Sequence, residues 1–341
     1  MEAFQNGLFA RAARGEATPR PPIWLMRQAG RTDPQYNALR ERDGRPLEQL
    51  FADPDSAAEI SLLPKRIGVD AIIYFQDILT PLTPMGCPFV FRPGPITDAP
   101  IRDAADVAKL RKFDVAAELP FIAQTFKNVT RSLNGELPVL GFAGAPVTLA
   151  VFMIEGKSFG HTASKALDFF EKQPEATRLL LDRLTEMTIE YLQYQIDSGA
   201  FAVQLFESAA NLLTSALYRS LALPTHQRIF SALRGRAPTI MFAREWEDVA
   251  DLHASGADIL SIHSTISIAD ARKVVGKDRV IQGNLSNRLL CDGPFDAIER
   301  EARAIVESGG RKGHIFNLDH GLLRETPFGH VEHLVRVVRS L

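Results

Sequence analysis

Short apolar runs recur along the whole chain, and each is followed by a polar loop and then by a stretch with helical periodicity. Each run is continuous and nearly free of alternation between apolar and polar residues. Uninterrupted runs of this length are typical of parallel strands that are buried on both faces. Eight runs fit this description, at residues 23–26, 71–75, 138–142, 201–206, 238–242, 258–262, 279–283 and 314–318.

Amphipathic stretches with the period of a helix lie between these runs. A strand followed by a helix, repeated eight times, predicts an α/β protein whose single domain, residues 1–341, is a closed (β/α)8 barrel of the TIM type. An open doubly wound sheet is the alternative, but the Gly-rich nucleotide fingerprints of such sheets are missing. The segment 4–13 is expected to cover one end of the barrel. The expected helices are 54–67, 121–134, 162–170, 175–198, 247–255, 268–275, 294–308 and 329–341.

Composition narrows the possible partners. The 341 residues are 45% hydrophobic and 23% charged, with a net charge of −2, so no overall field attracts nucleic acid or an anionic membrane. No stretch is long enough to span a membrane, and the N-terminus lacks a signal pattern. The two cysteines, Cys87 and Cys291, form neither a disulfide framework nor a metal-binding spacing. We therefore expect a soluble, unprocessed cytoplasmic protein.

The first apolar run ends in a loop that is suited to binding an anion. Arg27 and Arg31 stand four residues apart, separated by Gln28, Ala29 and Gly30. Gly30 permits backbone angles that turn the amides of this loop inward, beside both guanidinium groups. Arginine pairs with carboxylates through two parallel hydrogen bonds, so the loop favours an acidic ligand. The alternative is a surface loop with two solvated arginines.

Other polar residues follow the later runs, and a barrel brings all of these positions to one end. Asp77 is a candidate acid, although it also fits the cap of a turn. Ser208 fits a helix N-cap, which is the commoner role for a lone serine at such a position, and His320 fits a turn or a buried histidine. The histidines lack paired metal-binding spacing, so no metal site is expected. The positions that follow the runs include Arg27, Asp77, Ser208, His263, Asn284, Asp319 and His320, with Phe152 shortly beyond the third run.

Six motifs together resemble the uroporphyrinogen decarboxylase family, and the resemblance runs nearly from end to end. The family removes the four acetate carboxyls of uroporphyrinogen III, giving coproporphyrinogen III in haem biosynthesis. The resemblance implies a (β/α)8 barrel, a homodimer and a reaction without a cofactor. The motifs are WLMRQAGR at 24–31, FQDILTPLTPMG at 75–86, GFAGAPVTLAVFMIEG at 141–156, VQLFES at 203–208, IQGNL at 281–285 and HIFNLDHGLLRETP at 314–327.

The resemblance also assigns roles to individual residues. Arg27 and Arg31 match the family's carboxylate-binding arginines, in a substrate-binding loop that includes Gln28, Ala29 and Gly30. Asp77 matches the aspartate that binds the pyrrole nitrogens. Ser208 and His320 match a hydroxyl and a histidine of the substrate cleft, and Phe152 occupies a substrate-facing position. Arg27, or water held by it, is the family's candidate for delivering a proton to the ring.

Several rim positions depart from the family pattern. Phe152 stands where tyrosine is usual, and Asp319 stands where glycine is usual. These departures leave a second interpretation open, in which the chain is a divergent paralogue that binds a tetrapyrrole or another anionic ligand without decarboxylating it. A corrinoid-linked methyltransferase would need a His-x-Cys pair, which is absent. The other departures include Thr32, Val147, Ala209, His263 and Ser286.

Overall fold

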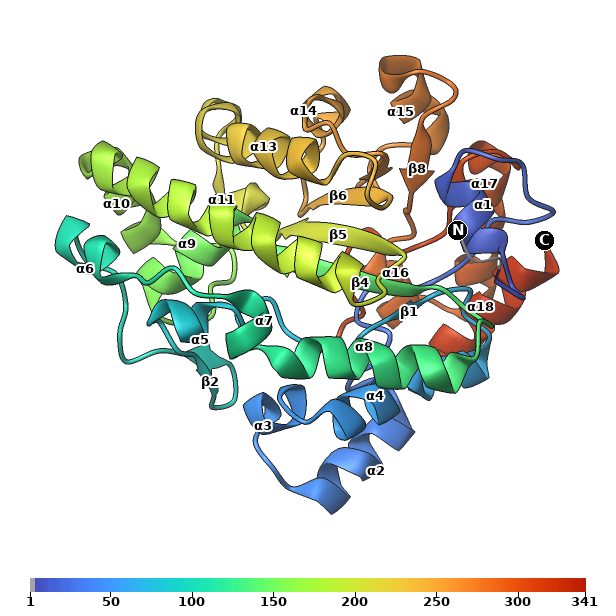
Figure 1. The fold of residues 1–341 in the computed structure, drawn as a ribbon. Helices are drawn as coiled ribbons and strands as arrows, with labels where there is room; N and C mark the ends of the chain where they lie inside the picture. Colours follow the sequence, from blue (N-terminus) through green and yellow to red (C-terminus); the bar gives the residue numbers. More distant parts are fainter. Residues whose placement is uncertain (1–3) are drawn as a thin grey trace.

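A computed structural model describes residues 4–341, in which seven parallel strands form one curled sheet surrounded by helices (Figure 1). The order in the sheet is β1-β4-β5-β6-β7-β8-β9, so successive strands of this sheet are neighbours in space. Each strand coincides with one of the predicted apolar runs. The bounds are β1 Ile72–Ile73, β4 Val139–Gly144, β5 Ala202–Glu207, β6 Thr239–Ala243, β7 Ile259–Ser261, β8 Val280–Gln282 and β9 His314–Ile315.

The first predicted run closes the barrel between β9 and β1. Ile23 forms a parallel bridge with Phe316, and the Phe316 amide donates to the Pro22 carbonyl at 2.8 Å. On the other side, the Asp70 amide donates to the Ile23 carbonyl at 2.7 Å. The eighth position is therefore occupied, and the predicted TIM-type fold is confirmed.

This eighth segment forms an isolated bridge rather than the regular strand that was predicted for residues 23–26. In a regular strand, the backbone amides of this segment would donate to the carbonyls of neighbouring strands, but here they donate to side-chain oxygens. The Ile23 amide donates to the Asp70 carboxylate at 2.8 Å, and the Met26 amide donates to Asn317 Oδ1 at 3.1 Å. The Leu25 amide donates to Gln28 Oε1 at 3.0 Å, which also begins the turn into the arginine loop.

Helices cover the outside of the sheet, and the eight predicted helical stretches all contain helix (Figure 1). The larger ones are α2 Pro34–Asp43, α4 Pro54–Leu62 with the following turn η1 Leu63–Ile67, α8 Pro120–Leu133, α9 Pro146–Glu155, α10 Ser164–Lys172, α11 Pro174–Asp197, α13 Leu223–Leu233, α15 Ile268–Val275, α17 Phe295–Gly309 and α18 Phe328–Ser340. The shorter ones are α1 Leu8–Ala13, α3 Leu47–Phe51, α5 Leu82–Met85, α6 Ala104–Lys109, α7 Val115–Glu118, η2 Ala210–Leu212, α12 Ser215–Leu217, η3 Tyr218–Ala222, α14 Val249–Ala254 and α16 Asn287–Asp292.

The sequence did not predict α9 because this helix has almost no polar face. Eight of its ten residues are buried, so the apolar residues do not recur with a helical period. A small antiparallel hairpin, β2 Val90–Phe91 and β3 Pro95–Ile96, was also not anticipated. It packs against α3, where the rings of Phe51 and Phe91 lie 5.7 Å apart, and Phe91 and Pro95 line one of the cavities described below.

The segment that contains α1 lies at the N-terminal end of the strands, as predicted for residues 4–13. The rings of Phe4 and Phe9 contact Phe201, which directly precedes β5, at centroid distances of 5.3 and 6.2 Å. The Gln5 amide donates to the carbonyl of Gly135, shortly before β4. Because this end is covered, the C-terminal ends of the strands form the accessible end of the barrel.

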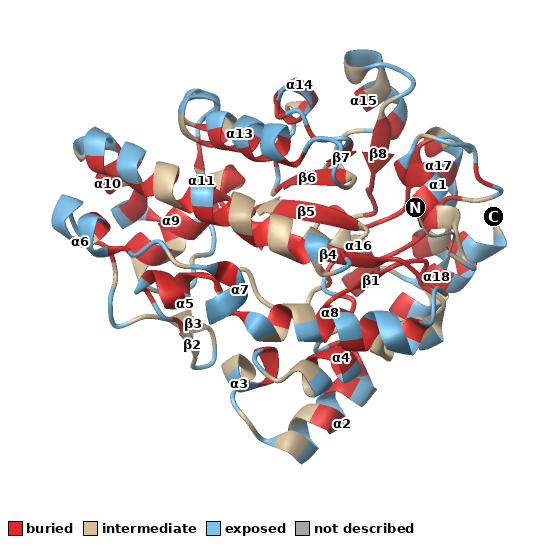
Figure 2. Ribbon diagram, viewed as in Figure 1, coloured by how far each residue is buried: buried red, intermediate tan, exposed pale blue. Residues whose placement is uncertain are grey.

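The barrel interior is buried, as Figure 2 shows, but it is not wholly apolar as the sequence suggested. Gln204 on β5 and Gln282 on β8 are both fully buried and joined by a hydrogen bond of 2.9 Å. The Trp24 indole N–H donates to Gln282 Oε1 at 3.0 Å. These paired groups tie the closing segment to opposite parts of the sheet, and pairing offsets the cost of burying their polar atoms.

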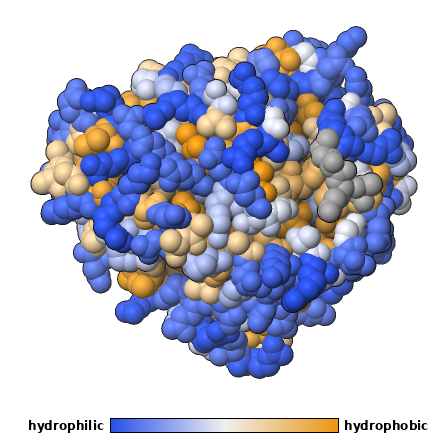
Figure 3. All heavy atoms as spheres, in the orientation of Figure 1, coloured by the Kyte–Doolittle hydropathy of each residue, from blue (hydrophilic) through white to orange (hydrophobic). Residues whose placement is uncertain are grey.

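The visible surface is largely hydrophilic, with apolar residues scattered over it (Figure 3). Within residues 4–341, no helix combines the length and the apolar composition needed to cross a bilayer. Both cysteines are buried free thiols.

Candidate active site

Two adjoining cavities lie at the C-terminal ends of the strands. The larger has a volume of about 760 Å³ and a polar lining, and the smaller, of about 430 Å³, has a mostly apolar lining. They adjoin because five residues line both of them: Arg27, Ile78, Phe152, Phe159 and Ser208. Two residues that are far apart in sequence, Asp77 in the smaller cavity and His320 in the larger, thus face one continuous cleft.

Arg27 occupies the centre of this cleft and owes its position to the two ends of the chain. The Leu322 amide donates to the Met26 carbonyl at 2.9 Å, which places Gly321 directly against the Arg27 side chain. A Cβ on Gly321 would lie 2.5 Å from Arg27 Cδ, so only glycine leaves room for the guanidinium to enter the cleft. The Arg27 side chain is exposed to the cleft, but the cleft walls surround it and limit its contact with bulk water. This desolvation, together with the positive charge of Arg244, lowers the pKa of Arg27.

The turn that follows is built differently from the one predicted. The left-handed backbone conformation belongs to Arg27, at φ 63°, whereas Gly30 does not adopt it. Gln28 is buried, and its side chain donates to the Ala71 carbonyl at 3.1 Å. Ala29 lines the smaller cavity. Arg31 is exposed and is not among the residues that line either cavity. The structure thus brings Arg27 and Ala29, but not Arg31, to the cleft.

Asp77 both caps a turn and faces the smaller cavity, so the two roles considered for it coexist. Its carboxylate accepts hydrogen bonds from the Leu79 amide, from the Thr80 amide at 3.0 Å and from the Thr80 hydroxyl at 2.9 Å. Burial nevertheless raises the pKa of Asp77 to about 6, with a smaller contribution from the negative charge of Glu48. A carboxylate of this kind is poorly solvated and interacts strongly with a nearby cation.

Phe152 and Ser208 line both cavities. The Phe152 ring contacts Phe159 at a centroid distance of 4.6 Å and Phe89 at 6.2 Å, which forms an apolar wall. Ser208 does not cap a helix, because the short helix η2 begins after Ala209 without a side-chain cap. The N-cap interpretation of Ser208 is therefore wrong. Glu207, which precedes it, is fully buried and bonded to Thr148 and His226 away from the cleft.

His320 lies in the larger cavity as a neutral ring. Its Nδ1 accepts a hydrogen bond from the Gly321 amide at 2.6 Å, which leaves Nε2 to carry the proton. Burial lowers the pKa of His320 to about 3, and the charges of Arg27 and Arg244 contribute to this shift. At neutral pH, His320 is therefore an uncharged hydrogen-bond donor.

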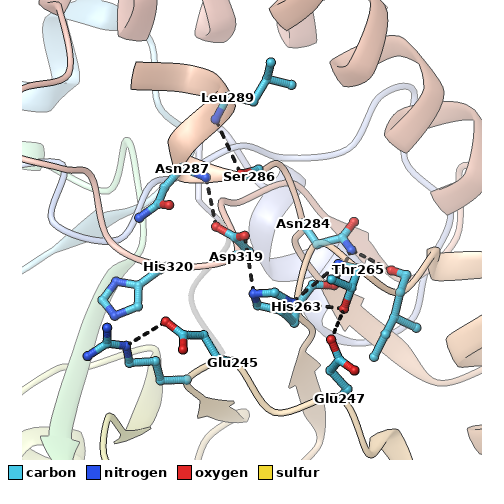
Figure 4. Close-up of polar contacts among 12 residues, drawn as sticks. Glu245, Glu247, His263, Thr265, Asn284, Ser286, Asn287, Leu289, Asp319 and His320 are labelled. Carbon is cyan, nitrogen blue, oxygen red and sulfur yellow. Dashed lines mark hydrogen bonds and ion pairs between the residues drawn. The ribbon is translucent and has the colours of Figure 1, made fainter. Parts of the chain in front are cut away.

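Asp319 is not a free carboxylate at the rim. One oxygen accepts a hydrogen bond from the Asn287 amide, at the start of α16, at 2.9 Å. The other lies 3.7 Å from His263 Nε2 (Figure 4). The partners of Asp319 are therefore the Asn287 amide of α16 and the His263 ring.

We expect Asp319→Gly, which restores the residue usual in the family, to destabilise this protein. The change removes an acceptor from a helix N-terminus, which costs about 1 kcal/mol, and should lower Tm by roughly 1 to 2 °C in a chain of this length. Differential scanning calorimetry will measure this. Asp319→Asn, which keeps an acceptor oxygen, should lose less stability. An unchanged Tm in the glycine variant would mean that the Asn287 contact contributes nothing.

Arg244 is a cleft residue that the sequence reasoning missed. It follows β6 and lines the larger cavity, where its Nε donates to Glu245 Oε1 at 3.2 Å. The signal that could have found it is its position, because Arg244 is the first residue after β6 and residues after a strand reach the open end of a barrel. Arg27, Arg244 and Arg288 all line the larger cavity, so the cleft offers three cations to an acidic ligand.

Comparison with known proteins agrees with this arrangement. Residues 4–341 match the family model described as uroporphyrinogen decarboxylase. A uroporphyrinogen decarboxylase of Syntrophotalea carbinolica is 40% identical over 338 residues, covering 98% of this chain and 97% of the relative. One from Chloroflexus aurantiacus is 41% identical over 343 residues, covering 97% of this chain and 95% of the relative.

Among solved structures, a methyltransferase from Methanosarcina mazei superposes with a TM-score of 0.82 at 20% identity, covering 99% of both chains. A B12-independent methionine synthase from Shewanella sp. W3-18-1 reaches a TM-score of 0.56 at 11% identity, covering 84% of this chain and 87% of the other. At these identities, the likeness concerns the fold alone.

Proposed function

We propose, from the membership of this chain in the uroporphyrinogen decarboxylase family, that it converts uroporphyrinogen III to coproporphyrinogen III by removing four acetate carboxyls. One observation of the site carries the proposal. A poorly solvated carboxylate, Asp77, and a guanidinium, Arg27, line the same mostly apolar cavity. That pairing suits a flat ligand with acidic arms around its edge and N–H groups at its centre.

The reaction needs an electron acceptor for the pair that is left when the carbon–carbon bond breaks. Protonating the pyrrole makes a cationic ring that accepts this pair as carbon dioxide leaves. We propose that Asp77, which is ionised above a pKa of about 6, stabilises that cation by facing the pyrrole N–H groups. In a cleft filled by the ligand, opposite charges attract more strongly than they do in water.

The remaining cleft residues would bind and orient the substrate. Arg27 would pair with an acetate or propionate arm, since its guanidinium is held inside the cleft by Gly321. Ala29 and Phe152 would contact the face of the macrocycle, and Ser208 and neutral His320 would donate hydrogen bonds to it. Gln28, Gly30 and Arg31 would belong to the loop that shapes this site. Arg31 would contact an arm that extends beyond the cavity.

The decisive experiment incubates the purified protein with uroporphyrinogen III under anaerobic conditions and separates the products by their number of carboxyl groups. We expect intermediates with seven, six and five carboxyls, followed by coproporphyrinogen. If the protein binds uroporphyrin but releases no product, under conditions in which another uroporphyrinogen decarboxylase works, the chain is a binding paralogue and the proposal is wrong.

Phe152→Tyr should increase the rate. The added hydroxyl supplies one neutral hydrogen bond to the ligand, about 0.5 to 1.5 kcal/mol, and the ring keeps its contacts with Phe159 and Phe89. We expect kcat/KM to rise roughly 2- to 10-fold. Steady-state assays on both proteins will measure the change. A rate that falls or stays equal would show that the hydroxyl has no partner in this cleft.

We also propose that the protein acts in the cytoplasm as a single-domain homodimer, as the family resemblance implies. Two free, buried thiols are compatible with a reducing compartment. Sedimentation at several concentrations will test the dimer, and cell fractionation will test the compartment. A mass that stays at 37.7 kDa over the whole range would contradict the dimer.

A further inference from the structure

Glu245 has a backbone conformation that glutamate rarely adopts. Its φ is 52°, in the left-handed region, where the Cβ atom is crowded. Within residues 4–341, two other residues besides glycines share such a φ, Asn134 and Arg27. Asn134 ends helix α8, a place where this conformation is common. Arg27 and Glu245 both line the larger cavity. Because strained residues cluster at functional sites, the backbone of Glu245 indicates a role in the cleft.

Two fixed neighbours place the turn at Glu245. The Arg244 amide donates to the Glu207 carbonyl at 3.0 Å, which continues the pairing of β5 with β6. Trp246 is buried, and its ring stacks on Tyr218 at a centroid distance of 4.0 Å. The chain turns between these two anchored residues, and the turn brings the Glu245 carboxylate back to the guanidinium of Arg244.

The contact with Glu245 satisfies Arg244 only in part. Arg244 Nε donates to Glu245 Oε1 at 3.2 Å, and Nη1 makes a long contact of 3.5 Å with the Gly160 carbonyl (Figure 4). A guanidinium carries five N–H donors in a planar fork, and among residues 4–341 these two acceptors are the ones that Arg244 reaches. The side chain is 19% exposed and lines the larger cavity, so its remaining donors are available to a ligand there.

The Glu245 carboxylate is also held by its second oxygen. Oε2 accepts from Asn211 Nδ2 at 3.2 Å and lies 3.8 Å from His161 Nδ1. These partners do not depend on Arg244, so Oε1 can leave the guanidinium while Oε2 keeps its contacts. The Glu245 side chain is 40% exposed, and ion pairs of this kind contribute little. An anion that binds Arg244 more strongly can therefore displace Oε1.

The cavity attracts an anion to this point. Desolvation and the charge of Arg244 lower the pKa of Arg27, and no carboxylate offsets these two causes. The charges of both arginines also act on His320, which remains a neutral hydrogen-bond donor. A carboxylate between these groups would be attracted by both arginines. Arg288 is less suited, because its side chain is 74% exposed and lies 4.0 Å from Asp292 on the same helix.

Resting on the function proposed above, we propose that Arg244 binds one carboxylate arm of the tetrapyrrole, and that Glu245 is the internal carboxylate which this arm displaces. The arm pairs with the fork of Arg244 through two parallel hydrogen bonds, whereas Glu245 makes one. Oε1 returns to Nε when the arm leaves. Arg244 thus stays in place in the empty cleft, and the ligand can exchange one arm for another, as the removal of four carboxyls in turn requires.

The first test is Glu245→Gln, with Glu247→Gln as the matched control. Both residues are exposed carboxylates of one loop that line the larger cavity, but Glu247 accepts from the Thr265 hydroxyl at 2.8 Å rather than from an arginine. Fluorescence titration with uroporphyrin, at a fixed ionic strength, should give a dissociation constant about 2- to 5-fold lower in Glu245→Gln, the scale of one exposed ion pair. Glu247→Gln should change it much less.

Two results of this titration would overturn the proposal. Equal tightening in the two variants would mean that only the net charge of the cavity matters. Weaker binding in Glu245→Gln would mean that Glu245 supports Arg244 instead of competing for it. Because both positions are exposed, both variants should fold.

The second test repeats Glu245→Gln in an Arg244→Met background. Arg244→Met alone should weaken uroporphyrin binding about 10- to 100-fold, since it removes a charge-assisted pair. Glu245→Gln should then give no gain, because the group for which Glu245 competes is gone. A gain that persists without Arg244 would contradict displacement. Arg244→Gln, which keeps a donor for the Gly160 carbonyl, takes the place of Arg244→Met if the latter does not fold.

These titrations measure uroporphyrin binding and do not require turnover. If they give the expected results but no product forms, the role of Arg244 stands and the decarboxylase function fails. If product forms and Glu245→Gln gives no Arg244-dependent gain, the displacement alone is wrong. A wild type that does not bind uroporphyrin would refute both. In an active enzyme, Glu245→Gln should lower KM and leave kcat unchanged, as expected for a contact made equally in the ground state and the transition state.

Discussion

Asp77→Asn should lower kcat by roughly 100- to 1000-fold while leaving the fold intact. The carboxylate is the group that distinguishes a cationic pyrrole from a neutral one, and removing one preorganised electrostatic group typically costs this much. The amide keeps an oxygen that can accept from the Thr80 amide, so the turn should lose no more than about 1 kcal/mol. Single-turnover assays, together with thermal unfolding, will measure both quantities.

The pH dependence of Asp77 supplies a second measurement. Its folded-state pKa of about 6 lies above the ordinary value near 4, so the folded protein holds this proton longer than the unfolded chain does. Stability contributed by this group is therefore lost as the pH rises from about 4 to 6, while kcat/KM should rise through about pH 6 as the carboxylate forms. Both trends should disappear in Asp77→Asn. A variant with retained activity and lower stability would make Asp77 only the cap of its turn.

Arg27→Ala should weaken uroporphyrin binding by about 10- to 100-fold. A hydrogen bond between a guanidinium and a carboxylate contributes about 1.5 to 3 kcal/mol, and Arg27 faces both cavities. Fluorescence titration with uroporphyrin will measure the dissociation constant. The variant should also raise the pKa of His320, although burial, the larger cause of its shift, will keep that value below the ordinary one.

Arg31→Ala is the matched control for Arg27→Ala. It removes the same charge from the same loop, but the Arg31 side chain is exposed and does not line either cavity. We expect its effect on the dissociation constant to be only a few-fold. If Arg31→Ala weakens binding as much as Arg27→Ala, the ligand extends beyond the cavities over the loop. If neither variant weakens binding, the cleft does not bind carboxylates at Arg27.

The strands were predictable because a buried parallel strand leaves a direct mark on the sequence. Every apolar run became a strand or the closing segment 22–24 of the barrel. The departures from the predicted strands depend on side chains that come from distant parts of the sequence. Asp70 and Asn317 take the amides of Ile23 and Met26, and this is why the first run forms only a bridge. Likewise, the pairing of Gln204 with Gln282 depends on two strands meeting in space.

The site was predictable where a residue lies within a few positions after a strand, and less so where a longer loop sets the path of the chain. Asp77, Ser208 and His320 reach the cleft for the first reason. The arginine loop was predicted from the spacing of two arginines around a glycine, and that spacing did not show that Arg27, rather than Gly30, takes the left-handed conformation. Nor did it show the contact between Arg27 and Gly321, which joins two motifs at opposite ends of the sequence.

Because of this contact, the cation site forms only when the first and the last segments of the barrel have both folded. Met26 is hydrogen-bonded to Asn317, 291 positions later, and Arg27 enters the cleft beside Gly321. During synthesis, the arginine loop is made first and its neighbour almost last, so a nascent or C-terminally truncated chain has Arg27 without the segment around Gly321 and Leu322 that holds it in the cleft. Tetrapyrrole capture should therefore appear only after the last strand has joined the first segment. In a refolding experiment, porphyrin fluorescence would then report barrel closure itself, separately from the earlier gain of helical signal.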